Sequence, residues 1–403
     1  MRKLWAYENG LVLMMSLCNG VVALDRTAVS YLSPQIVAEF HINNTQLGLL
    51  ASGLSVAVAC SSYLLSSLAD ATGRRKLILV PMLVLFSVCS ALSGMATGFA
   101  FLLAARVVLG LTEGPIAPIA QSVVAIESTE SRRGLNIGIM LNLGAALLGM
   151  GLGPIVATHI AEAFGWRAAF FLSCFPGLLV ALSIVGWMRP VRASPSTALP
   201  AASVDAGGVL TLLGSRNILL CIGISGLFSA WLIVQGVFLP LYLVRMDGLK
   251  STDMGWVLAA TGVAAAAAGM VVPAFSDRFG RRPVLALITF FGMAAPAATL
   301  FVHGSPALLA AALFVGYLGA GAGPLYIGIV PAESAPARFV ATAVAISMTS
   351  GELIGGVLGP AAAGRAADLF GLAAPFWISG ACAAACGVMS LFLVETAPRQ
   401  RTA

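Results

Sequence analysis

Three ionisable residues lie inside apolar stretches of this 403-residue chain: Asp25 and Arg26 in one stretch and Glu113 in another. A charged side chain in an apolar, membrane-like medium costs about 2.5–3.5 kcal/mol, so such residues are functional candidates. Arg donates two parallel hydrogen bonds to a carboxylate. Arg26 is therefore predicted to bind an anion, and Asp25 and Glu113 to accept protons and compete for the charge of Arg26. The alternative is that Asp25 and Arg26 only neutralise each other.

A second polar group is expected on the apolar stretch 99–126. Arg106 and Glu113 are seven residues apart, which is about two helical turns, so they share a face about 10 Å apart along the axis. They can line one polar track without touching. Gly110 and Gly114 allow another helix to approach closely. Pro115 and Pro118 predict a kink in the helix that frees backbone carbonyls beside Glu113.

The composition indicates which elements position these residues. The chain is 59% hydrophobic and 9% charged, which is typical of a membrane protein. Stretches of about 20 apolar residues can span a membrane as helices. Twelve are expected, at roughly 11–34, 45–66, 77–97, 99–126, 134–160, 168–188, 217–244, 253–275, 284–303, 306–331, 339–364 and 371–394. The predicted fold is an all-α membrane protein with twelve transmembrane helices and no soluble domain.

The distribution of basic residues predicts orientation. Most Lys and Arg fall in segments on the same side as the N-terminus, and the other side carries only Arg167, Arg245, Lys250 and Arg365. By the positive-inside rule, both termini are expected in the cytoplasm. The formal charge of +6 then reflects orientation, and nucleic acid is not expected as a partner.

Chemistry typical of enzymes is not indicated. The seven cysteines lie inside predicted helices without a CxxC pair, and the three histidines are scattered. A nucleophile–base set, a phosphate loop and a metal cluster are all missing from the sequence. We therefore expect neither an enzyme nor a metal or other cofactor, with the proton as the coupling ion.

The two halves of the chain repeat each other. Asp70 in "LADATGRRK" corresponds to Asp277 in "FSDRFGRRP" (277 − 70 = 207), and Glu127 corresponds to Glu333 (333 − 127 = 206). A parallel repeat of six helices is typical of transporters with a midplane binding site between the repeats. The predicted organisation is two pseudo-symmetric six-helix bundles joined by a cytoplasmic linker, with bounds 1–190, 191–215 and 216–403.

These motifs resemble the major facilitator superfamily over essentially the whole chain. Its signature of Gly, Asp, Gly and two basic residues recurs in both halves, with Ser66 and Pro273 replacing the first Gly. The resemblance implies a latch that holds the inward ends of the halves together in one state. Its residues are Asp70, Gly73, Arg74, Arg75, Asp277, Gly280, Arg281 and Arg282.

Within the superfamily, the chain resembles the anion:cation symporter family. The shared features are Asp25-Arg26, the sequence from Arg106 to Gly114, "RRGLNIG" and "GWRAAFF". The resemblance implies proton-coupled uptake of a small organic anion: a carboxylate, sugar acid or aromatic acid. The stretch "SSYLLSSLAD" departs from the family pattern. Spinster-like lysolipid transporters carry the same charges, so a proton-coupled exporter of drugs or lysolipids stays the alternative, and a non-transporting receptor is third.

The remaining candidates are polar residues in apolar stretches. Those expected to bind substrate with Arg26 are Tyr31, Gln121, Asn142, Gln235, Tyr242, Tyr326 and Ser347. Those expected in proton coupling are Asp25, Arg106, Glu113 and Glu352; Glu352 alternatively hydrogen-bonds within its own half. The expected partners are the organic anion, protons and membrane lipid. The expected protein is a monomer in a bacterial inner cell membrane.

Overall fold

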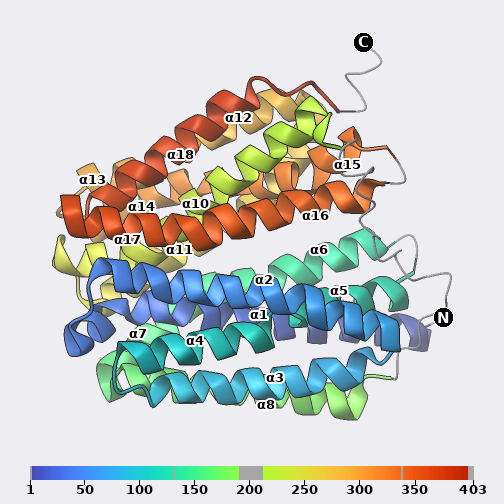
Figure 1. Cartoon of the computed structure of the whole chain (residues 1–403), viewed down its shortest axis with the longest axis horizontal. Helices are drawn as coiled ribbons and strands as arrows, with labels where there is room; N and C mark the ends of the chain where they lie inside the picture. The colour runs from blue at the N-terminus through green and yellow to red at the C-terminus, as the bar shows by residue number, and fades with distance from the viewer. Residues whose placement is uncertain (1, 130–131, 190–211, 337–338, 398–403) are drawn as a thin grey trace. The chain divides into compact units, whose positions relative to one another are not determined.

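The computed structural model describes residues 2–129, 132–189, 212–336 and 339–397, with the backbone alone described for 2–6, 70 and 341. Every regular element in these ranges is helical (Figure 1). The chain divides into two compact units: residues 1–42 with 53–201, and residues 43–52 with 202–403. Most of the predicted linker, from 191 to 211, lies outside the described residues.

The first unit is built from long helices interrupted by short irregular segments. Helix α2 (Asn44–Thr72) starts in the second unit and continues in the first. The other elements are α1 (Arg2–Phe40), α3 (Arg75–Gly94), α4 (Phe99–Glu113), α5 (Ile116–Glu127), α6 (Arg133–Gly144), the π-helical η1 (Ala145–Leu152), α7 (Gly153–Phe164) and α8 (Trp166–Trp187).

The second unit has the same construction. Its elements are α10 (Arg216–Arg245), α11 (Ser251–Phe279), α12 (Arg281–Phe291), α13 (Ala294–Phe301), α14 (Pro306–Tyr317), the 3-10 segment η2 (Leu318–Ala322), the π-helical η3 (Leu325–Ile329), α15 (Val330–Ser334), α16 (Val340–Ser350), the π-helical η5 (Gly351–Leu358), α17 (Gly359–Phe370) and α18 (Ala374–Ser390).

Eleven helices in the described part of the chain are long and apolar enough to cross a membrane. The all-helical membrane fold is therefore confirmed, and the protein is a multi-pass membrane protein. In the last predicted stretch, 371–394, the apolar helix Ala374–Ser390 has only 17 residues. The count of twelve spans thus stays a prediction.

The internal repeat is visible in the backbone. The π-helical segments η1 and η5 match end to end, since 351 − 145 = 206 and 358 − 152 = 206. Gly165 follows α7 and Gly371 follows α17, and both have a positive φ, of 83° and 88°. Packing repeats as well: α8 contacts α1 and α3, and α18 contacts α10 and α12. An offset of 206 therefore relates these segments of the two units, and the turns at Gly73 and Gly280 are related by 207.

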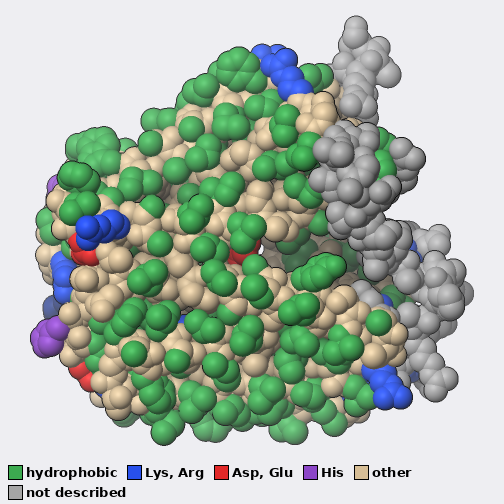
Figure 2. All heavy atoms as spheres, in the orientation of Figure 1, with side chains coloured by type: hydrophobic (Ala, Val, Ile, Leu, Met, Phe, Trp, Pro, Cys, Tyr) green, Lys and Arg blue, Asp and Glu red, His purple; other side chains and the backbone are tan. Residues whose placement is uncertain are grey.

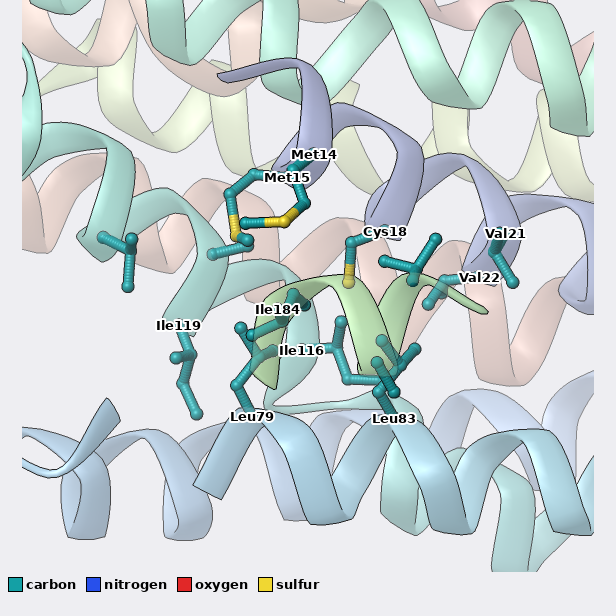
Figure 3. Close-up of a cluster of buried hydrophobic side chains, with 14 of the residues drawn as sticks. Met14, Met15, Cys18, Val21, Val22, Leu79, Leu83, Ile116, Ile119 and Ile184 are labelled. Atoms are coloured by element: carbon teal, nitrogen blue, oxygen red, sulfur yellow. The ribbon is translucent and has the colours of Figure 1, made fainter. Parts of the chain in front are cut away.

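Apolar side chains both fill the interior and cover the surface. In the first unit, residues from α1, α3, α5 and α8 meet in a core that includes Met15, Leu79, Ile116 and Ile184 (Figure 3). Figure 2 shows hydrophobic side chains spread over the visible face, whereas most of the visible Lys and Arg side chains lie toward its margins. Such an apolar exterior is suited to lipid rather than to water.

The start of α2 is held by α17 within the second unit. The Asp368 carboxylate accepts hydrogen bonds from the backbone N–H groups of Asn44 and Thr45, at 2.9 Å each. It also accepts from Asn44 Nδ2 at 2.9 Å and from Thr45 Oγ1 at 2.5 Å. A carboxylate that binds free N–H groups at a helix N-terminus stabilises that end of the helix.

Candidate functional site

Arg26 and Glu113 form the more accessible of the two ion pairs that join α1 to α4. Arg26 Nη1 lies 3.2 Å from Glu113 Oε1 and joins α1 to the last residue of α4. The Arg26 side chain is 33% exposed and that of Glu113 is 5% exposed. The guanidinium is thus partly exposed, whereas the carboxylate beside it is buried.

Asp25 and Arg106 form the second pair, which is completely buried. Arg106 Nη1 lies 3.4 Å from Asp25 Oδ2, and the two side chains are 1% and 0% exposed. The guanidinium also lies over the Phe170 ring, 5.0 Å from its centroid. Since burial of an unpaired charge is very costly, each member of this pair stabilises the other.

Three serines complete the surroundings of the buried pair. Ser90 and Ser173 donate from their hydroxyls to Asp25 Oδ1, Ser173 at 3.1 Å. Ser93 Oγ accepts from Arg106 Nη2 at 2.6 Å. The carboxylate and the guanidinium therefore both have hydrogen-bonding partners in the dry interior.

The pairing differs from the expectation that Asp25 and Glu113 compete for Arg26. Adjacent residues on a helix point about 100° apart, so Asp25 and Arg26 face different neighbours. Asp25 contacts Arg106, and Arg26 contacts Glu113. Arg106 and Glu113 lie on one helix, as expected, and each binds a different residue of α1.

The close approach of a helix to α4 is confirmed. A Cβ atom on Gly110 would lie 2.7 Å from Leu54 O, and one on Gly114 would lie 2.6 Å from Val58 O. The helix is interrupted where the kink is expected, because α4 ends at Glu113 and α5 begins at Ile116. The glycines thus allow α2 to contact the segment that carries Glu113.

The predicted latch residues of the second unit meet around Arg281. Its Nη2 lies 2.6 Å from Asp277 Oδ1 and 2.9 Å from Glu333 Oε1. Gly280 makes the intervening turn with φ +99°, a conformation that side chains disfavour. Glu395 accepts hydrogen bonds from the backbone N–H groups of Arg281, at 2.8 Å, and Arg282, at 3.0 Å.

The equivalent turn of the first unit has the same backbone. Gly73 has φ +64°, and Arg75 Nε donates to Ser122 Oγ at 2.9 Å. Arg74 is the residue that precedes α3. The side chain of Asp70 lies outside the described residues. The role of these residues in holding the halves together stays a prediction.

Glu395 gives the first testable prediction, on acid stability. Burial raises its pKa, but backbone N–H donors from Ala397, Arg281, Arg282 and Thr396 outweigh burial and hold the pKa below its ordinary value of 4.5. A carboxyl whose pKa is lowered on folding stabilises the protein above its unfolded pKa, and this contribution is lost as the pH falls through the folded pKa. Glu395→Gln should therefore lower Tm at neutral pH, and the difference from wild type should shrink below about pH 4.5.

The control is Asp253→Asn, which removes an exposed acid of α11. Thermal unfolding of the detergent-solubilised protein at several pH values measures both differences. A Glu395→Gln difference that stays constant down to the acid limit of folding would contradict the assignment.

The candidate substrate residues of the first unit lie on three elements. Tyr31 is buried and donates from its hydroxyl to Gly149 O at 3.1 Å. Asn142 donates to Gly138 O of its own helix at 3.0 Å. Gln121 is exposed on α5. These contacts bring none of the three to the Arg26–Glu113 pair.

The candidate residues of the second unit are mostly buried. Gln235 and the Tyr326 hydroxyl have no hydrogen-bond partner among the described residues, and Tyr326 packs against Phe228. Tyr242 packs against Phe376, while Ser347 donates to Ala343 O of its own helix. Glu352 is half-buried on η5, and π-helical segments are frequent at functional sites.

Two groups of polar residues were not expected from the sequence. Glu8 is buried on α1 and accepts hydrogen bonds from Thr129 and, at 2.7 Å, from Asn136 Nδ2. The serines around Asp25 and Arg106 form the other group. Glu8 was a detectable signal, since it is an acid near the start of an apolar stretch. The serines were not, since serine occurs throughout this chain's helices.

A metal site is not found: the described residues hold no group of three or more His, Cys, Asp or Glu side chains that could bind an ion. The candidate site instead consists of two acid–base pairs between α1 and α4. The Arg26–Glu113 pair is partly exposed, and the Asp25–Arg106 pair is buried. Such an arrangement can bind an anion and exchange a proton.

Comparison with known families agrees with this architecture. The family model described as Major Facilitator Superfamily matches residues 15–250 and 219–403. The chain belongs to the Major Facilitator Superfamily. The predicted family is thus confirmed. A solved structure of a bacterial homologue of the human lysosomal transporter Spinster, inward-facing and unoccupied, has a TM-score of 0.77, and the match covers 96% of this chain and 95% of that one. At 18% identity, it supports the fold alone.

Two curated relatives are named for organic anions. The hexuronate transporter of Bacillus subtilis is 30% identical over 63% of this chain and 62% of its own length. The probable L-galactonate transporter of Escherichia coli is 26% identical over 62% of this chain and 57% of its own length. The match thus spans about 60% of these two relatives.

Proposed function

We propose that this protein is a proton-coupled secondary active transporter that takes up a small organic anion by alternating access. The observation that carries the proposal is the Arg26–Glu113 pair, in which a partly exposed guanidinium lies 3.2 Å from a buried carboxylate. Two relatives named for a hexuronate and for L-galactonate, both sugar acids, support this substrate class. Membership of this family and relatives named as transporters support a function other than catalysis.

Coupling follows from competition for one positive charge. When Glu113 is ionised, Arg26 is neutralised and offers little to an incoming carboxylate. When Glu113 takes up a proton, its charge is removed and Arg26 binds the substrate anion through paired N–H groups. Substrate and proton then enter together. Asp25 and Arg106 hold α1 against α4 and contribute a second protonation site, and Glu352 is a further candidate.

We assign both termini to the cytoplasm on the asymmetry of the basic residues, and the protein to a bacterial inner membrane because its two relatives named for sugar acids are bacterial. It works as a monomer with no cofactor other than the coupling proton. The Asp277–Arg281–Glu333 group is proposed as part of the conformational latch.

A ligand screen tests the substrate class. Thermal shift of the purified protein should show stabilisation by sugar acids or other carboxylates, and the stabilisation should disappear in Arg26→Ala. Stabilisation only by cationic drugs or lysolipids, unchanged in Arg26→Ala, would remove the anion proposal and favour the exporter alternative.

A further inference from the structure

A groove of about 540 Å³ opens on the second unit at the ends of three helices. Arg216 is the first residue of α10, and Arg282 is the second residue of α12. Residues 391–395, which follow the last residue of α18, form the rest of the lining. Because α10 and α12 begin two of the membrane-spanning helices, the groove lies where the hydrocarbon of a bilayer meets water.

The groove combines an apolar wall with two cations. The apolar wall consists of Leu391, Phe392 and Val394, whose side chains are exposed. Arg216 and Arg282 are exposed as well, and within the described part of the chain neither guanidinium makes a hydrogen bond or an ion pair. A planar guanidinium binds phosphate oxygens through paired N–H groups. The groove therefore offers anion donors beside a surface that an acyl chain can cover.

Glu395 is the one acid among the residues that line the groove. Its carboxylate accepts hydrogen bonds from four backbone N–H groups, those of Arg281, Arg282, Thr396 and Ala397. Two guanidinium groups and one carboxylate give the lining a formal charge of +1, since 2 − 1 = 1. The groove thus complements an anion rather than a cation.

The first unit has a groove of similar size, about 480 Å³, whose lining holds no charged residue. Three pairs of lining residues in the two grooves are separated by the offset of 206 that relates η1 to η5: Gly10 and Arg216, Gly186 and Phe392, and Trp187 and Leu393. The fold therefore builds this groove without arginine in one unit. Arg216 gives the groove of the second unit a different chemistry.

We propose that the groove of the second unit binds a phospholipid with an anionic head group. The phosphate contacts Arg216 and Arg282, and an acyl chain packs along the apolar wall. Basic pockets between membrane helices are suited to such head groups. The segment that follows the groove in the chain does not complement it, because residues 398–403 carry Arg399 and Arg401 and no acid. The inference goes beyond the proposed function and does not depend on the transported substrate.

Lipid titration of the delipidated full-length protein, followed by native mass spectrometry, tests this. Phosphatidylglycerol should bind more tightly than phosphatidylcholine. In Arg216→Ala combined with Arg282→Ala, the affinity for phosphatidylglycerol should fall by about fivefold for each arginine, or about 25-fold in all, and the preference for it should disappear. The same variant pair with lysine keeps both charges and should retain most of the preference, which separates loss of binding from loss of folding.

The matched control is Arg245→Ala combined with Arg278→Ala. It removes the same charge from two exposed arginines, at the last residue of α10 and near the end of α11, and should bind both lipids as the wild type does. Phe392→Ala should weaken both lipids, because it removes part of the apolar wall.

Three results would overturn the proposal. The preference for phosphatidylglycerol could survive the loss of Arg216 and Arg282, or the control variant could lose it equally, which would indicate a general effect of charge. Displacement of the lipid by inorganic phosphate at the same concentration would instead indicate a site for a soluble anion.

Discussion

Arg26→Ala is expected to weaken binding of the organic anion by about 100-fold or more. Removing one partner of a desolvated, hydrogen-bonded charge pair costs about 2–5 kcal/mol. Arg26 is the only member of the two pairs with a substantially exposed side chain, at 33%, so we expect it to be the cation that a ligand contacts. The measurement is isothermal titration of the purified protein with the best carboxylate from the thermal-shift screen.

Two variants sharpen this prediction. Arg26→Lys keeps the charge but loses the planar pair of donors, so it should recover only part of the affinity. Arg167→Ala removes an arginine of α8 that pairs with Glu39 at 2.7 Å and is itself 36% exposed; it should bind normally. Equal losses in Arg167→Ala and Arg26→Ala would mean that the effect is a general one of charge or folding.

Glu113→Gln is expected to abolish accumulation of substrate on a pH gradient while substrate-for-substrate exchange continues. Glutamine cannot exchange a proton, so transport no longer carries one. The change also removes the negative charge of Glu113 from beside Arg26. Binding should therefore lose the part of its pH dependence that comes from Glu113, and the net uptake driven by protons should fall to the level of protein-free liposomes.

The choice of Glu113 rather than Asp25 for this test follows from burial. Asp25→Asn should also stop accumulation. However, it leaves the buried Arg106 guanidinium without its carboxylate partner, so the substitution should also lower the stability of the folded protein. The control is Glu39→Gln, an exposed acid at the other end of α1. If Glu113→Gln still concentrates substrate on a pH gradient, Glu113 is not the coupling acid.

The membrane helices and the internal repeat were predictable, because the length of each apolar stretch and the repeated turn motifs can be recognised in the sequence. Gly73 and Gly280 both adopt the positive φ that the motif requires. The exact number of membrane-spanning helices was not predictable, because α18 has only 17 residues. A helix shorter than the bilayer is hard to distinguish from a long one by composition when its ends continue into apolar residues.

Within the site, residue types predicted the participants but not their partners. Asp25, Arg26, Arg106 and Glu113 are conspicuous as charges in apolar stretches. Which acid meets which base depends on the rotation of α1 against α4, and a single sequence fixes that rotation only loosely. The serines near Asp25 were invisible, because a hydroxyl in a membrane helix more often bonds its own backbone, as Ser87 does.

The most direct test of the account is accumulation of a labelled sugar acid, such as a hexuronate, in proteoliposomes with an acidic exterior and a neutral interior. The account predicts that the anion is concentrated inside, that a protonophore abolishes the gradient, and that Glu113→Gln only equilibrates the label. Equilibration without concentration in the wild-type protein, or outward movement of substrate on the same gradient, would contradict proton-coupled uptake.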